Sequence, residues 1–398
     1  MGEENGAARA EEEKLWRFVP PHEFSTPSAP AREAVRQGIT RFLQRFRSDE
    51  TPPSLEEAED PHGAALEDAA LHRRLPPFML EERGARLAEA LEAAGGRGMP
   101  VVIDPPHAGG REALRHLAAV RGYRIAEAPP RATLLGEPET ILATIEALDA
   151  QPLVVPALER LFLRTPQSLE ALRLLLDRLQ ERTAPTVLGC GSWAWRFLEE
   201  AIEIDVSFQA RLVPGPLDAA RLHRWFSMPA LRCVERSGGV LVGDGPCGDE
   251  PPEYLRRLAA SARGSAGTAR ALWGEALRLP PPEEEPEESA AGNEDAEKRP
   301  RPDLLVVPWQ QLKLPAFPGK AARDDLMLLQ LLLLHDGLEE TVARAMLPFE
   351  PARIGTRLRS LARAGLVACE DGLWHVPPLA YPSVRHELSS TGFWVDGY

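Results

Sequence analysis

The stretch that decides the fold is VVIDPPHAGGREAL, residues 101–114. VVID is a short apolar run, rich in β-branched residues, of the kind that forms a buried strand. A turn with two glycines follows it, and the next residues, GREALRHLAAVRG, have the composition of a helix. A buried strand, a turn and a helix make the first half of a strand–helix–strand unit, which predicts a parallel sheet.

The same alternation continues as far as Pro214. Further strands are predicted at YRIAEAP (123–129), PLVVP (152–156), TVLGC (186–190) and VSFQARLV (206–213). Helical segments separate them: ETILATIEALDA (139–150), a stretch from Leu158 to Arg182 that Pro166 interrupts, and WAWRFLEEAI (193–202). Strands that alternate with helices indicate an α/β protein whose parallel sheet is covered on both faces.

The composition then changes twice, which predicts several domains in this chain of 398 residues. PLDAARLHRWF (216–226) and PPEYLRRLAASARGSAGTARALWGEALR (251–278) predict a small all-helical unit, and the run PPEEEPEESAAGNEDAEK after it predicts a linker. The expected organisation is an N-terminal, partly disordered and helical segment (1–75), the α/β core (76–213), a helical lid (214–280), an acidic proline-rich linker (281–302) and a C-terminal domain (303–398).

The C-terminal domain has the pattern of a winged helix. RDDLMLLQLLLLHDG (323–337), LEETVARAM (338–346) and EPARIGTRLRSLARAGLV (350–367) predict three helices. ACEDGLWHVPP (368–378) predicts two strands joined at a DG turn. Three helices and a hairpin in this order are typical of winged-helix domains.

The turn after VVID corresponds in position to a phosphate-binding loop, for which the sequence G-x-x-x-x-G-K-[ST] is required. Aligned on Gly110, this chain has Pro105 at the first glycine, Arg111 at the lysine and Glu112 at the hydroxyl residue. Gly109, Gly110 and Arg111 are therefore candidate phosphate contacts, with the helix N-terminus as an anion site. A purely structural turn is the alternative, because Pro105 removes an N–H donor and Glu112 brings negative charge.

The ends of the next strands carry few catalytic groups. The third strand ends in VVPA, where an acidic pair that holds magnesium is expected, and Glu159 follows two residues later. Ser192, after the fourth strand, could sense a phosphate or cap the next helix. Arg270, in GTAR (267–270), could reach a nucleotide or lie on a helix surface.

These segments, in this order, resemble AAA+ ATPases, and the nearest branch is the origin-recognition and STAND-like group. The resemblance covers roughly residues 76–398. It implies a P-loop NTPase core with a helical lid and a winged helix, usually acting as a nucleotide-controlled oligomeric switch on DNA or a partner. By the same resemblance, Gly110 and Arg111 would contact phosphate, Ser192 would be the first sensor and Arg270 the second. The lysine, the metal hydroxyl and both acidic residues are missing, which argues against hydrolysis.

Composition narrows the remaining choices. A net charge of −14 disfavours a general nucleic-acid binder, and four widely spaced cysteines predict neither a zinc site nor disulfides. The N-terminus lacks a signal peptide, and LMLLQLLLL (326–334) is too short to span a bilayer, so we expect a cytoplasmic location without membrane insertion.

Three functions follow as hypotheses. The first is a pseudo-ATPase that regulates or scaffolds through protein partners, with no cofactor and no metal. The second is an ATP-binding switch, with ATP and magnesium as ligands and weak hydrolysis. The third is a DNA-binding regulator that uses Arg353 and Arg357, which share one face of a helix. A protein partner is favoured over DNA, and a homo-oligomer is an open alternative.

Overall fold

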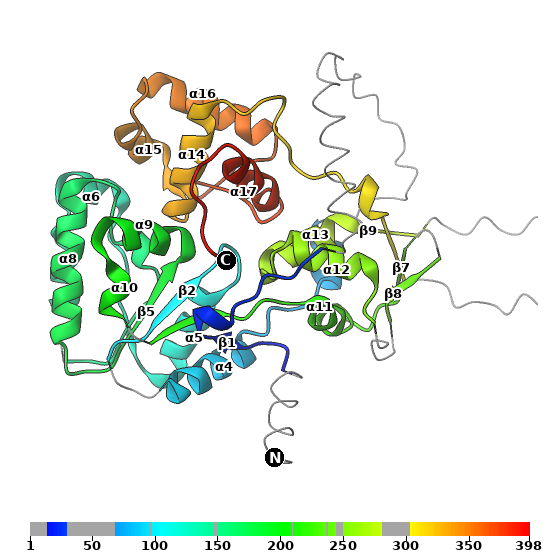
Figure 1. Cartoon of the computed structure of the whole chain (residues 1–398), viewed down its shortest axis with the longest axis horizontal. Coiled ribbons are helices and arrows are strands. Elements are labelled where there is room, and N and C mark those ends of the chain that lie inside the picture. Colours follow the sequence, from blue (N-terminus) through cyan, green and yellow to red (C-terminus); the bar gives the residue numbers. More distant parts are fainter. Residues whose placement is uncertain are drawn as a thin grey trace, which may run out of the picture.

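The computed structural model describes residues 14–29, 68–94, 98–146, 150–208, 210–235, 238–243, 250–280 and 303–398. Its centre is a six-stranded sheet in the order β1-β6-β2-β5-β4-β3 (Figure 1). The strands are β1 (Phe18–Val19), β2 (Val101–Asp104), β3 (Arg124–Ile125), β4 (Leu153–Val155), β5 (Thr186–Gly191) and β6 (Arg211–Pro214). All neighbours are parallel except β1, which pairs antiparallel with β6. The predicted α/β class with a parallel sheet is confirmed.

Alternate strand residues face two separate helical layers, as the period of two in a strand requires. One face, including Val102, Val154 and Leu212, packs against two helices, α4 (Leu80–Ala93) and α5 (Gly110–Arg121). The opposite face, including Ile103 and Val155, packs within a larger apolar cluster. The helices of that layer are α6 (Arg131–Gly136), α7 (Thr140–Glu146), α8 (Pro166–Glu181) and α9 (Ser192–Ile202).

The fifth predicted strand is shorter than expected. Residues Ile204–Ser207 form a short helix, α10, and β6 begins only at Arg211. The long predicted helix is divided at the proline, as expected: Leu158–Arg160 form a 3-10 turn, η2, and α8 starts at Pro166. Thr165 caps α8 by accepting a hydrogen bond from the Ser168 amide at 3.3 Å.

The unit after β6, expected to be all helical, also contains a sheet. The first predicted helical stretch forms α11 (Ala219–Phe226), and the second forms two helices, α12 (Glu253–Ser261) and α13 (Ala266–Ala276). They accompany a four-stranded sheet in the order β8-β7-β10-β9. Its strands are β7 (Cys233–Glu235), β8 (Val240–Val242), β9 (Leu277–Arg278) and β10 (Leu304–Val306). We call this assembly the middle unit.

Strand β10 comes from beyond the predicted linker, whose residues 281–302 lie outside the described residues. It pairs parallel with β7 and antiparallel with β9, and Leu304 and Val306 are buried in the apolar cluster of the middle unit. The chain therefore returns to the middle unit before it enters the C-terminal domain. The expected boundary at 302/303 had assigned β10 to the C-terminal domain instead.

The described part of the N-terminal segment connects the core to the middle unit. Phe18 and Val19 extend the core sheet as β1, while Leu15 and Trp16 are buried in the apolar cluster of the middle unit. The helix α3 (Asp68–Arg74) precedes α4. The rest of the predicted N-terminal segment, residues 1–13 and 30–67, lies outside the described residues.

Residues 321–398, the C-terminal unit, have the predicted order of helices and hairpin. The helices are α14 (Arg323–Leu334), α15 (Glu340–Met346), α16 (Pro351–Arg363) and an additional one, α17 (Tyr381–Ser390). The strands β11 (Leu338–Glu339), β12 (Ala368–Glu370) and β13 (Leu373–His375) form an antiparallel sheet in the order β11-β13-β12.

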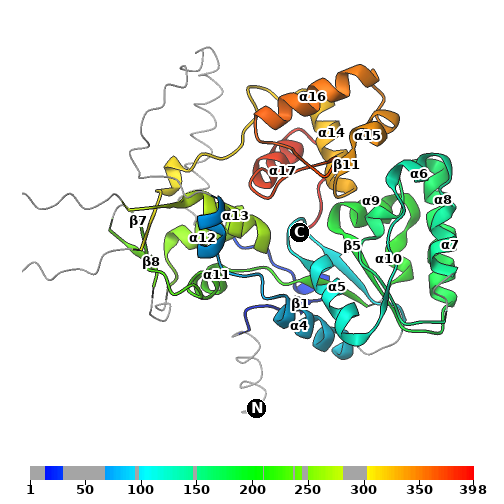
Figure 2. The same cartoon turned by 180° about the vertical axis from the view of Figure 1, so that it is seen from behind.

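The C-terminal unit and the core share one continuous apolar cluster, which includes residues of α8 and α9 together with α14, α16 and α17. The last residues of the chain run into the space between the core, the middle unit and the C-terminal unit (Figures 1 and 2). There, Trp394 packs on Trp193 of the core with ring centroids 5.7 Å apart. Within the described ranges, no helix combines the length and apolarity needed to traverse a bilayer.

Candidate functional site

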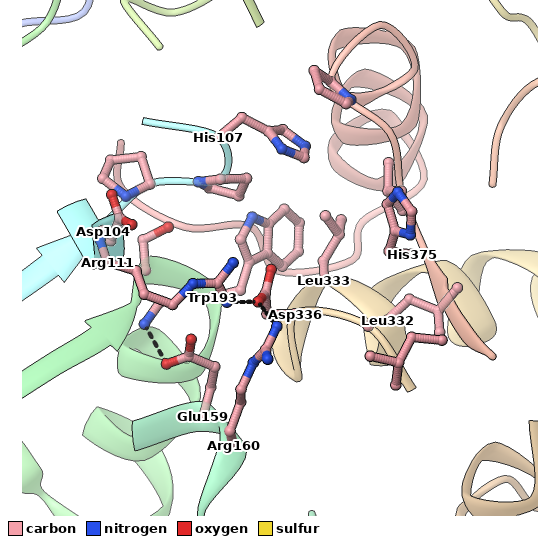
Figure 3. Close-up of a pocket in the computed structure, with 18 of the residues that line it drawn as sticks. Asp104, His107, Arg111, Glu159, Arg160, Trp193, Leu332, Leu333, Asp336 and His375 are labelled. Atoms are coloured by element: carbon pink, nitrogen blue, oxygen red, sulfur yellow. Dashed lines mark hydrogen bonds and ion pairs between the residues drawn. The ribbon is translucent and has the colours of Figure 1, made fainter. Parts of the chain in front are cut away.

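A cavity of about 480 Å³ lies where β2, β4 and β5 end, with the C-terminal unit as its opposite wall. In open parallel sheets, ligands bind at the carboxyl ends of the strands where the strand order reverses, and β2 is the strand at which it reverses here. The charged and aromatic side chains that line the cavity are those of Asp104, His107, Arg111, Glu112, Glu159, Arg160, Trp193, Asp336, Glu370, Asp371 and His375. Figure 3 labels Asp104, His107, Arg111, Glu159, Arg160, Trp193, Asp336 and His375 among them.

The turn after β2 presents backbone amides to a carboxylate of the same chain. Asp104, the last residue of β2, accepts hydrogen bonds from the amides of Gly110 at 2.8 Å and Arg111 at 3.0 Å. These amides begin α5, where the helix dipole favours negative charge. The anion site predicted at this helix N-terminus is therefore filled by the Asp104 carboxylate.

Gly109 is required by both conformation and space. It caps α5 with φ 85°, in the left-handed region, and a Cβ here would lie 2.4 Å from Nη1 of Arg83. Arg83 donates a hydrogen bond to the Ala108 carbonyl and lies 4.4 Å from the ring centroid of Trp16. The turn is thus held from behind by a buried guanidinium.

Arg111, predicted as a phosphate contact, is paired with an aspartate of the C-terminal unit. Its guanidinium donates to Asp336, which also accepts from Arg160 at 2.7 Å (Figure 3). Asp336 and Gly337 follow α14 with φ 50° and 88°, a left-handed pair that turns the chain into the cavity. A third guanidinium, of Arg131, donates to the His335 carbonyl at 2.8 Å.

Three arginines from separate core elements therefore meet the C-terminal end of α14. That end carries partial negative charge from the helix dipole, and Asp336 adds a full one. Although burial acts to raise the pKa of Asp336, Arg111 and Arg160 outweigh it, so the pKa is lowered and the carboxylate is ionised.

Ser192 does not cap α9, which was one of the two roles expected from the sequence. Gly191 holds the cap position, and the Ser192 hydroxyl donates to the carboxylate of Asp396, which also receives Nε of Arg385 at 3.1 Å. The amide of Gly191 donates to Glu159 at 2.8 Å. Glu159 lies in the first turn of η2 and is buried.

The structure brings Gly109, Arg111 and Ser192 together around the cavity, with Gly110 directly behind them. It does not bring Arg270 there. The Arg270 guanidinium donates to the Pro76 carbonyl at 3.0 Å and lies 5.1 Å from the ring centroid of Phe78. Arg270 thus packs beside the loop before α4.

The two predicted nucleic-acid contacts lie on α16, away from the cavity. Arg357 is directed inward and bonds to Asp324 and Asp325 of α14 at 2.7 and 2.8 Å. Arg353 is exposed and pairs with Glu350 at 3.6 Å. Arg353 and Arg357 therefore do not present one common face to solvent.

Negative charge dominates the cavity and perturbs its ionisable groups. Burial, reinforced by Glu112, raises the pKa of Asp104 to about 7. Burial and the nearby Asp336 also raise the pKa of Glu159, whereas burial lowers the pKa of His107 to about 4. Across the described ranges, no cluster of three or more His, Cys, Asp or Glu side chains could hold a metal ion.

The sequence analysis missed four residues that shape this site: Asp104, Arg160, Asp336 and Asp396. Asp104 could have been found, because a carboxylate that ends a strand before a glycine turn can cap the following helix. Asp336 lies 225 residues further along the chain than Arg111, and Asp396 lies 204 residues further than Ser192. No local pattern marks such contacts.

No protein-family profile matches this chain, and no curated sequence does. Two solved structures from Aeropyrum pernix are similar over most of its length. The ORC1 protein, solved in complex with DNA, is 17% identical with a TM-score of 0.32, covering 80% of this chain and 94% of its own. The ORC2 protein, solved as ADPNP–ADP complexes, is 13% identical with a TM-score of 0.30, covering 84% and 97%.

With TM-scores this low, the fold assignment depends on strand order and packing and not on these two proteins. The parallel order β6-β2-β5-β4-β3, the turn from β2 into α5 and the cavity at the strand ends are its basis. The chain is an α/β protein with a parallel-sheet core consistent with the P-loop NTPase type.

Proposed function

We propose that this chain is a non-hydrolysing regulatory or scaffolding protein of the cytoplasm, which acts through contacts with other proteins. One observation carries the proposal: carboxylates of the chain itself occupy the groups that would bind phosphate. Asp104 accepts from the amides at the start of α5. Asp336 pairs with Arg111, and Asp396 accepts from Ser192.

Magnesium triphosphate does not fit these residues. A triphosphate would have to displace Asp104 and Asp336 and then lie beside Glu112 and Glu159, whose negative charge would repel it. Glu112 also stands at the position where a hydroxyl is required to hold magnesium. We therefore derive no hydrolytic step for this site.

The packing also favours a fixed arrangement over a nucleotide-driven switch. A switch requires two alternative arrangements of its parts. Here the core and the C-terminal unit share one apolar cluster, and interfaces that are large and apolar resist relative motion. A constant surface formed by both units suits a protein that signals by contact.

An ATPase assay tests the proposal directly. We expect phosphate release at background rate in the wild type and in Arg111→Ala alike. Calorimetry with ATP and magnesium should give no heat, and excess ATP should not raise the melting temperature. A bound ligand at 100 times its Kd would stabilise the fold by about 2.7 kcal/mol. Turnover well above background that Arg111→Ala abolishes would overturn the proposal.

DNA binding is the second candidate, because the exposed side of α16 carries Arg353, Arg359 and Arg363. Such a helix can enter a major groove. The hairpin weighs against it, since Glu370 and Asp371 are acidic and line the cavity toward the core. A gel shift with duplex DNA at low salt decides: a shift that charge reversal at Arg353, Arg359 and Arg363 abolishes would favour DNA over a protein partner.

A further inference from the structure

The cavity between the core and the C-terminal unit is large enough for a ligand and has fixed walls. Its volume of about 480 Å³ lies within the range of small-molecule and side-chain pockets. Trp193 forms part of the core wall, and Leu332 and Leu333 of α14 form part of the opposite one. All three belong to the shared apolar cluster or pack against it, so the cavity does not depend on a movement to open.

Its charge is strongly one-sided. Among the described residues, six carboxyl groups line the cavity, against two guanidinium groups: Asp104, Glu112, Glu159, Asp336, Glu370 and Asp371 against Arg111 and Arg160. Both guanidinium groups are already bonded to Asp336. Arg111 also lies 3.7 Å from Glu112, and Glu370 lies 3.8 Å from the His375 imidazole. Asp104, Glu159, Glu370 and Asp371 therefore have no arginine partner at ion-pair distance among the described residues. Mutual repulsion is visible in two of them, because Glu112 helps to raise the pKa of Asp104 and Asp336 that of Glu159.

One further polar atom is left unsatisfied at the wall. The Nε2 atom of His107 is shielded from solvent and has no hydrogen-bond partner among the described residues. The ring packs edge-on against Tyr381, with centroids 5.9 Å apart, and burial keeps it neutral by lowering its pKa. A neutral imidazole nitrogen adds no positive charge that would oppose a cation.

We propose that this cavity binds a guanidinium or ammonium group carried on an aliphatic stem. The charged head would meet the carboxylates at the strand ends and the hairpin, and the stem would lie along Trp193, Leu332 and Leu333. Such a group is offered by an arginine or lysine side chain of a partner protein, and equally by a free alkyl amine or guanidine. The inference rests on the proposed function in one respect: the cavity must not be occupied by a nucleotide.

Binding of the cation strengthens as the pH rises. Because burial raises the pKa of Asp104 to about 7, this group gains its negative charge only near neutral pH. A cation that favours the ionised form binds more tightly at pH 8 than at pH 5.5, and its binding releases a proton at intermediate pH.

The test measures the binding of agmatine, a guanidinium on an alkyl amine, to the full chain. Calorimetry and thermal melting detect the binding. The affected variant is Glu112→Gln/Glu370→Gln/Asp371→Asn, which removes three carboxylates from the cavity mouth. Asn suits position 371, where φ is 51°. The control variant, Glu92→Gln/Glu139→Gln/Glu181→Gln, makes the same change in net charge at exposed sites outside the cavity.

We expect agmatine to bind the wild type and the control alike, and about tenfold more weakly to the mouth variant. A blocked Gly-Arg-Gly peptide that competes with agmatine assigns the site to a protein side chain; agmatine binding without such competition assigns it to a free amine. Absence of agmatine binding, or equal loss in both variants, overturns the inference. If ATP with magnesium is also inert, the proposed function stands; if ATP binds or turns over, the proposed function fails instead.

Discussion

At the residue scale, Asp104 caps the backbone amides at the start of α5 and should also make the stability of the fold depend on pH. Its folded pKa of about 7 exceeds its usual value of 3.8, so between these values the folded state binds more protons than the unfolded state. This contribution to stability is complete below pH 3.8, declines as the pH rises and is lost above about 7. The free energy of unfolding, measured with denaturant, should differ less between pH 5 and pH 8 in Asp104→Asn than in the wild type. An equal difference in both proteins would refute this assignment.

Gly109 gives a second prediction at this scale. Gly109→Ala should destabilise the fold by about 2–4 kcal/mol, because it combines a left-handed backbone with a clash against the buried Arg83. Gly122→Ala is the matched control: its φ is 67°, but no atom of the described part of the chain lies within 4 Å of a new Cβ, so a loss of about 1–2 kcal/mol is expected. Urea denaturation of both variants measures the difference. Equal losses would mean that Arg83 gives way freely.

Single residues also show how far the site could be predicted from the sequence. Pro105, Gly109 and Arg111 were identified as one turn, because the residues that form a local turn are neighbours along the chain. The groups that neutralise this turn come from elsewhere: Asp336 reaches Arg111 across 225 positions. A single sequence records no such pairing, so Arg111 could be interpreted equally as a phosphate contact or as a structural residue.

At the element scale, the end of α14 is held by converging arginines, and a double-mutant cycle can measure the strength of one contact. Asp336→Asn preserves the left-handed conformation and removes the charge. Combined with Arg160→Gln, it should show a coupling free energy of about 0.5–1.5 kcal/mol. The lower part of the usual range is expected because the Asp336 side chain is 43% exposed and solvent screens the pair. Additive losses would show that the contact is energetically neutral.

Elements differ in how far the sequence could predict them. The core strands were found because β2, β4 and β5 are apolar on both faces, a pattern typical of strands in a covered parallel sheet. The sheet of the middle unit was missed. Its strands β7 and β10 have three residues each, and β10 lies beyond a long polar stretch, so neither length nor neighbourhood indicated a pairing.

At the scale of the whole molecule, the continuous apolar cluster makes the core and the C-terminal unit one cooperative body, while the middle unit has its own cluster. The segment 392–398 reinforces this union, because Trp394 packs on Trp193, Asp396 bonds to Ser192 and Arg263 of the middle unit donates to the Tyr398 carbonyl at 2.8 Å.

Deletion of residues 392–398 should therefore destabilise regions far from the cut. The loss of a buried tryptophan contact and of the Asp396 network is expected to cost about 3–5 kcal/mol. Hydrogen exchange should accelerate in α9 of the core as well as in α17, and the tryptophan fluorescence of the protein should shift to longer wavelength as water reaches Trp193. Asp396→Asn, which keeps the chain and most contacts, should give a smaller loss in the same places. Faster exchange confined to α17 would show that the two units unfold independently, and the fixed-surface basis of the proposed function would then fail.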